Sequence, residues 1–231
     1  MTSTDTHRPI PLGLTLLIAV FSAFVALAVS GTHHAHAATG VSHSHAAQPP
    51  VSAASFALHT DMRRLWEEHV TWTRLAIISL TTDSPDTKAT VARLLRNQTD
   101  IGNAVKPYYG AAAGGKLTAL LRSHILIAAD LIAAAKEGDT AGVASEQATW
   151  TANADRIASL LASANPHFWP VGPIKSMLHD HLRLTTDEVL ARLSGHWDAD
   201  VAAYDRIHIQ ALHMADMLSN GIIHQFPARF R

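Results

Sequence analysis

The chain has 231 residues, of which 48% are apolar and only 6% aromatic, so a single domain with a mainly aliphatic core is expected. Its formal net charge of −1, from 18 basic and 19 acidic residues, provides no field that would attract nucleic acid over distance, and no nucleic-acid partner is expected. The absence of cysteine excludes disulfides, thiolate nucleophiles and iron–sulfur clusters, so metal ligands would have to be His, Asp, Glu or Met.

Residues 1–31 are predicted to be a signal peptide or a membrane anchor. The uncharged stretch from Ile10 to Gly31 is longer than the apolar region of a cleaved signal, about 7–15 residues, and close to the roughly 20 residues of a spanning helix. Ala35-His36-Ala37 is a candidate cleavage site, so cleavage and anchoring both stay open. Arg8 precedes the segment and no Lys or Arg follows until Arg63, which predicts an extracytoplasmic domain, anchored or secreted.

Residues 32–55 are predicted to be a flexible, His-rich linker, because their small residues and Pro49-Pro50 cannot build a core. Short His-rich tracts can capture Cu, Zn or Ni with little selectivity, and the alternative is a solvated spacer. The histidines concerned are His33, His34, His36, His43 and His45.

Residues 56–231 are predicted to form an all-α domain, a bundle of about six helices in three αα-hairpins. Turn residues separate the apolar, helix-periodic segments, and no strand-like alternation of useful length occurs. Ala111 to Gly115 is predicted to be a flexible joint, and Gly221 a C-terminal cap. The expected helices span about 58–80, 86–106, 116–136, 140–163, 173–193 and 198–220.

A repeat of about 56 residues is suggested by histidines on the apolar stripes of these helices. His69, His124 and His181 are 55 and 57 residues apart. In the second helix of each unit, Asn97, Asn153 and His208 follow at separations of 56 and 55. Since one such hairpin buries little surface alone, packing of three units would supply the core.

Four histidines, His69, His124, His181 and His208, are therefore predicted to point inward from four helices and to bind a transition metal, Cu, Zn or Fe. A carboxylate-bridged di-iron centre is disfavoured, because no Glu-x-x-His pair is present. Haem ligation by paired inward histidines stays open, without covalent attachment. The main alternative is that each histidine hydrogen-bonds a carbonyl or carboxylate and joins helices in a non-enzymatic structural or interaction domain.

Helix 198–220 carries the densest polar cluster, and its residues His208 to Ala215 resemble the His-x-x-Ala-x-x-Met-Ala signature of a ferritin-like helical family of unknown function. That family is often found in exported bacterial proteins associated with copper, and it usually has two adjacent histidines, whereas Ile207 stands here. The span from Leu65 to Pro227 also resembles small bacterial helical proteins, some of which are labelled acetylglutamate kinase. Such a kinase needs an α/β sheet and glycine-rich phosphate loops, and Gly114-Gly115 is only an isolated pair.

These patterns predict an exported or membrane-anchored bundle that binds a metal ion, with the N-terminal helix in the membrane if it is not cleaved. No catalytic residue is assigned, because the chain has no Gly-x-Ser-x-Gly elbow, no His-Glu-x-x-His pair and no cysteine nucleophile. A metal-dependent oxidase or peroxidase-like enzyme is a third possibility, which metal-dependent turnover would distinguish from the others.

Overall fold

The computed structural model describes residues 52–231, and the described part is an all-α bundle without strands. The expected signal or anchor, and nearly all of the expected linker, lie outside these residues. The helices are α2 (Ala53–Thr82), α3 (Thr87–Glu137), α4 (Thr140–Ala164), α5 (Val171–Leu193) and α6 (Trp197–Gln225), followed by the short 3₁₀ helix η1 (Pro227–Arg229). The predicted fold class is confirmed at the level of an all-α helical bundle.

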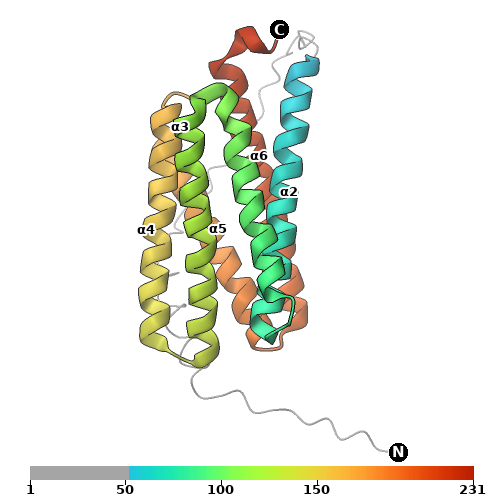
Figure 1. Ribbon diagram of the computed structural model, residues 1–231, viewed down its shortest axis with the longest axis vertical. Helices are drawn as coiled ribbons and strands as arrows, with labels where there is room; N and C mark the ends of the chain where they lie inside the picture. Colours follow the sequence, from blue (N-terminus) through green and yellow to red (C-terminus); the bar gives the residue numbers. More distant parts are fainter. Residues whose placement is uncertain (1–51) are drawn as a thin grey trace, which may run out of the picture.

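Helix α3 reverses direction at Gly110, so that its two legs, 87–109 and 111–137, run side by side (Figure 1). Gly110 has φ 82° and ψ 166°, a conformation essentially open only to glycine. The reversal thus needs one residue, and the predicted flexible joint at Ala111 to Gly115 is wrong, since these residues are helical.

The two legs of α3 approach closely beside the reversal because glycines face each other there. A Cβ atom on Gly102 would lie 1.9 Å from Oγ1 of Thr118, and one on Gly114 would lie 2.6 Å from the carbonyl oxygen of Gly102. α3 is long and apolar enough to cross a membrane, judged by length and composition alone. In the structure it bends, and its legs pack against α2 and α4.

The helices run roughly along the long axis of the molecule, and α2 packs against both α3 and α6 (Figure 1). The second leg of α3 packs on α4, α4 packs on α5, and α5 pairs with α6. The first and last helices of the domain are therefore neighbours. The core between them is aliphatic, as composition predicts, with Leu94, Ile101, Ile174, Ile207 and Ile222 fully buried.

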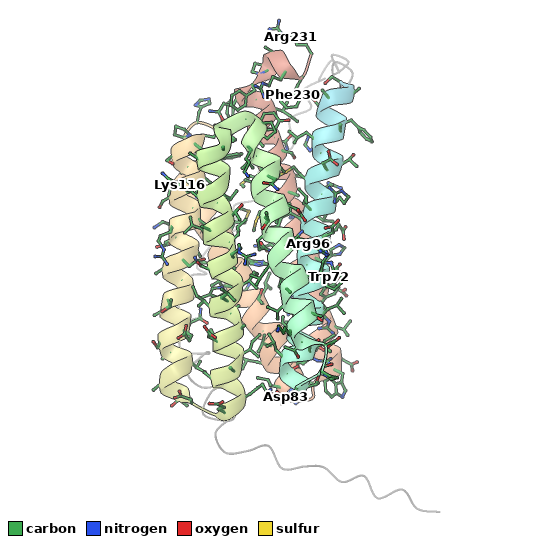
Figure 2. All side chains as sticks on the ribbon, viewed as in Figure 1. Trp72, Asp83, Arg96, Lys116, Phe230 and Arg231 are labelled. Carbon is green, nitrogen blue, oxygen red and sulfur yellow. The ribbon has the colours of Figure 1, made fainter. Side chains whose placement is uncertain are left out.

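Aromatic residues close the end of the bundle at which α3 reverses. Phe230 and Arg231 lie at this end, whereas Asp83 lies at the opposite one (Figure 2). The ring of Tyr108 stacks on Phe230 with centroids 5.9 Å apart. This stacking holds Phe230, near the C-terminus, against the turn of α3.

Gly221 does not cap α6 as predicted, because α6 continues to Gln225. A Cβ atom at Gly221 would lie 1.9 Å from Nε1 of the buried Trp169. The glycine is thus needed where the indole of Trp169 crosses the helix backbone, and the sequence signal of a helix stop was misleading.

A buried ion-pair network joins α2, α5 and α6. Arg74 on α2 donates to Glu188 on α5 at 2.8 Å and binds Asp200 on α6 with both terminal nitrogens. Arg192 donates to the same Asp200 at 3.1 Å. Both carboxylates are only 1% exposed, and burial raises the pKa of Glu188 while Arg74 opposes that shift. Such charges persist inside a protein because they are paired.

Candidate functional site

Three of the four predicted histidines come together in the middle of the bundle. His69 on α2, His124 on the second leg of α3 and His181 on α5 are between 4% and 6% exposed. The ring of His181 neighbours both other rings, with centroids 6.0 Å from His69 and 6.4 Å from His124. The sequence prediction of inward-facing imidazoles is confirmed for these three residues.

His124 is oriented by a carboxamide on the neighbouring helix α4. The amide nitrogen of Asn153 donates to the carbonyl oxygen of Leu120 at 3.1 Å, so its oxygen faces the ring. That oxygen lies 2.9 Å from Nδ1 of His124 and accepts its hydrogen. The neutral ring therefore carries its proton on Nδ1 and leaves a free lone pair on Nε2.

His181 is held in the same way by Gln210 on α6. The amide nitrogen of Gln210 donates to the carbonyl oxygen of Met177 at 2.7 Å. Its oxygen accepts from Nδ1 of His181 at 3.0 Å. Nε2 of this second ring is thus also unprotonated and able to bind a metal.

Around His69 the same task is divided between two adjacent amides. Asn97 donates to the carbonyl oxygen of Leu65 at 3.0 Å, and Gln98 places its amide nitrogen 3.1 Å from Nδ1 of His69. Nδ1 of His69 therefore accepts a hydrogen bond, and the proton of the neutral ring resides on Nε2. The same amide nitrogen also lies 3.0 Å from the carbonyl oxygen of Leu94 and 3.1 Å from Oδ1 of Asn97, so its two hydrogens are shared among three acceptors. The side-chain oxygen of Gln98 is buried without a partner among the described residues.

These contacts repeat along the chain with a fixed interval. In each unit, the carboxamide that contacts the ring lies 29 residues after the histidine. The backbone carbonyl that accepts a hydrogen bond from an amide of the same unit lies four residues before the histidine. The repeat suggested by the histidine spacing is therefore visible in the side-chain contacts. In the third unit, however, the residue that corresponds to Asn153 is Gln210. The predicted correspondence of His208 with Asn97 and Asn153 is therefore wrong.

His208 lies outside the cluster, which corrects the prediction that it points inward. Its side chain is 35% exposed, and Nε2 lies 2.8 Å from a carboxylate oxygen of Glu67 on α2. The ring also stacks on Tyr204 at a centroid distance of 6.1 Å. His208 faces α2 at the surface, whereas Gln210, two residues further on, faces α5.

Burial keeps the clustered histidines neutral. It lowers the pKa of His124 to about 3, and the neighbouring His181 acts in the same direction. Burial also lowers the pKa of His181, and it lowers the pKa of His69 well below its ordinary value, with His181 and His124 adding to the effect. Neutral imidazole is the form that binds metals, so the cluster is in the binding-competent charge state at neutral pH.

A cavity of about 40 Å³ adjoins all three rings and extends between α2, α3 and α5. Most of its wall is aliphatic, and none of the described residues that line it is charged. Three buried polar atoms of residues that line it have no hydrogen-bond partner among residues 52–231: Oγ1 of Thr73, Oγ1 of Thr186 and Nε1 of Trp150. Such unpartnered groups are uncommon in protein interiors.

The rings stand wider apart than in a formed metal site. Two imidazoles on one tetrahedral metal at about 2.0–2.1 Å have ring centres about 5 Å apart. Within residues 52–231, no group of three or more His, Asp or Glu side chains is close enough to hold a metal ion. Coordination by all three thus requires His181 to approach each of His69 and His124 by about 1 Å, and His69 and His124 to converge as well.

Sequence reasoning missed Gln98 and Gln210, because it sought histidines or carboxylates as partners of the inward rings. The signal that could have found them is the interval of 29 residues, which separates a carboxamide from the histidine in every unit. Comparison of the chain with protein-family models, with curated proteins and with solved structures finds no match.

Proposed function

We propose that the protein binds one transition-metal ion, Cu, Zn or Fe, through Nε2 of His69, His124 and His181. The observation that carries this proposal is the set of three buried, neutral imidazoles whose Nδ1 atoms are each contacted by a carboxamide of the paired helix. A metal-bound histidine almost always makes a hydrogen bond through its other ring nitrogen, which fixes the ring and its tautomer. His208 is no longer part of the proposed ligand set.

The bundle supplies this site by repetition. Three helical hairpins, α2 with the first leg of α3, the second leg with α4, and α5 with α6, each contribute one ring and its amide. Because the rings come from different hairpins, a bound metal would join all three. The same hydrogen bonds also stabilise each hairpin without metal, which is the alternative, purely structural role of the histidines.

His69 is the ligand that must change state on binding. His124 and His181 already present lone pairs at Nε2, whereas His69 carries a proton there because its Nδ1 accepts from Gln98. Coordination through Nε2 requires that proton to move to Nδ1 and the Gln98 amide to turn its oxygen toward the ring. Gln98 thus acts as a positioning residue for the third ligand.

The proposed site lies outside the cytoplasm, in a protein that is secreted or anchored through residues 1–31. This part of the proposal rests on the apolar stretch from Ile10 to Gly31 and on the position of Arg8.

Metal content tests the proposal. The full chain, with its linker histidines at positions 33, 34, 36, 43 and 45 replaced by serine and without an affinity tag, is incubated with each metal, desalted and measured by elemental mass spectrometry. We expect about one equivalent of Cu, Zn or Fe, lost in His124→Ala and kept in His208→Ala, the matched control. An absence of bound metal in the parent, or equal binding by both variants, would leave the histidines with the structural role.

A further inference from the structure

The end of the bundle at which α3 reverses is a surface with a composition of its own. The helices alternate in direction, so α2 begins at this end, and α4 and α6 end there (Figure 1). Contacts join these elements, since the hydroxyl of Tyr109 donates to the side-chain oxygen of Gln225 at 2.6 Å and its ring lies 5.4 Å from that of Trp169. We call this surface the reversal end and define it by residues 52–57, 106–116, 164–173 and 225–231.

The reversal end is basic. Its four segments contain no Asp or Glu. Asp61, further along α2, has the guanidinium of Arg64 beside it at 4.0 Å. The cations of the reversal end are all exposed to solvent, and they are Lys106, Lys116, Arg229 and Arg231.

The turns at the opposite end of the bundle are acidic. They comprise residues 82–87, 136–140 and 194–198, which contain a single lysine, Lys136. The charge of the domain is thus polarised along its long axis. The acidic residues of these turns are Asp83, Asp86, Glu137, Asp139 and Asp198.

Apolar side chains are exposed among the cations of the reversal end. Phe56 is 67% exposed, Val171 45% and Phe168 36%. Exposed aromatic and aliphatic side chains beside Lys and Arg suit an anionic membrane surface, because the apolar groups enter the headgroup boundary while the cations attract lipid phosphates. Trp197 is also exposed, at the opposite end, but its neighbour in the chain is Asp198.

The position of the N-terminal segment also points to a membrane as the partner. Residues 32–51 join the apolar stretch from Ile10 to Gly31 to α2, which begins at the reversal end (Figure 1). With that stretch in the membrane, the reversal end is tethered close to lipid, and tethering raises the effective concentration of the two surfaces. We propose that the reversal end binds the surface of a membrane that contains anionic phospholipid. This inference rests on the proposed anchoring through residues 1–31, and it does not depend on a bound metal.

The absence of cysteine allows one fluorophore to be attached at a chosen position. The full chain, labelled at Ala112→Cys or Ala141→Cys with an environment-sensitive dye, is reconstituted into phosphatidylcholine vesicles with or without phosphatidylglycerol. Both alanines are exposed and lie near a turn, Ala112 at the reversal end and Ala141 at the opposite end. Phosphatidylglycerol should shift the emission of the label at position 112 to the blue, and spin-labelled lipid should quench it. Neither effect is expected at position 141.

Removal of charge tests the role of the cations. Lys106→Gln combined with Lys116→Gln should lower the ratio of docked to undocked domains about 25-fold, about fivefold for each charge. The matched control is Lys88→Gln combined with Arg96→Gln, which removes two exposed cations of α3 outside the reversal end and should leave docking unchanged.

Removal of apolar surface tests the second component. Phe56→Ser should lower the same ratio about tenfold, whereas Leu126→Ser, at a residue that is 47% exposed outside the reversal end, should not. Equal responses of the two labels, or equal docking of each variant and its control, overturn this inference alone, provided that the chain floats with the vesicles. A chain that does not float with them overturns the anchoring and the docking together, and the metal measurement decides on the metal site independently.

Discussion

Replacing Asn153 by alanine tests the role of the amides directly. Asn153 is completely buried, and its side chain bridges Nδ1 of His124 and the carbonyl oxygen of Leu120. The substitution leaves the Nδ1 hydrogen of His124 buried without an acceptor, at a cost of about 1–3 kcal/mol. The carbonyl of Leu120 can still accept a hydrogen bond from its own helix, so losing the Asn153 amide costs less free energy there than at His124.

The volume left by the shortened side chain adds about 1 kcal/mol, which brings the expected loss in the free energy of unfolding to about 2–4 kcal/mol. Urea unfolding of the metal-free protein at pH 7, followed by circular dichroism, measures this difference. Asn103→Ala is the control, because Asn103 is an exposed asparagine in α3, and it should change the free energy by less than about 0.5 kcal/mol. Equal stability of Asn153→Ala and Asn103→Ala would refute the reasoning.

Three further predictions concern pH, metal affinity and packing. Burial lowers the pKa of His124 to about 3, so below pH 6.5 the unfolded chain binds more protons than the folded one. The free energy of unfolding should therefore fall by about 2 kcal/mol between pH 6.5 and pH 5 because of this residue. Urea unfolding should show a smaller loss over the same pH range in His124→Gln. Gln98→Glu supplies a carboxylate that accepts a hydrogen bond from Nδ1 of His69. Competition with a chelator should show that this variant binds the metal at least about tenfold more tightly, and its metal-free form should be less stable. Unchanged metal affinity would contradict the role assigned to Gln98. Gly221→Ala places a Cβ atom against Trp169 and should lower the free energy of unfolding by about 2 kcal/mol or more. In Gly115→Ala, the control, the Cβ atom meets nothing within 4 Å, and the free energy should rise by about 0.5–1 kcal/mol. Thermal unfolding of both variants measures these changes.

The helices could be predicted from sequence because each has an apolar stripe of sufficient length and turn residues at its ends. The limits of the helices differ from the prediction where a glycine can play either of two roles. Gly110 reverses the chain in a single residue, and Gly221 gives room to an indole that lies 52 residues away in sequence. Neither role can be distinguished from a flexible joint or a helix stop without knowing which element packs there.

The inward histidines on α2, α3 and α5 could likewise be predicted, since helical phase places them on buried stripes. Phase did not decide between His208 and Gln210, because these residues flank opposite edges of the buried stripe formed by Ile207, Ala211 and Met214. Which edge faces α5 depends on the order of helices around the bundle. That order brings Gln210 to His181 and His208 to Glu67.

The ion-pair network of Arg74 has a consequence for the order in which the domain can fold. Its partners Glu188 and Asp200 lie 114 and 126 residues further along the chain, so α2 reaches its final environment only after α5 and α6 are available. A chain that ends before α6 would leave Arg74 and Glu188 without Asp200 at a site built to bury charge. The first helix of the domain is therefore completed by the last, which makes late, all-or-none closure of the bundle the expected folding behaviour.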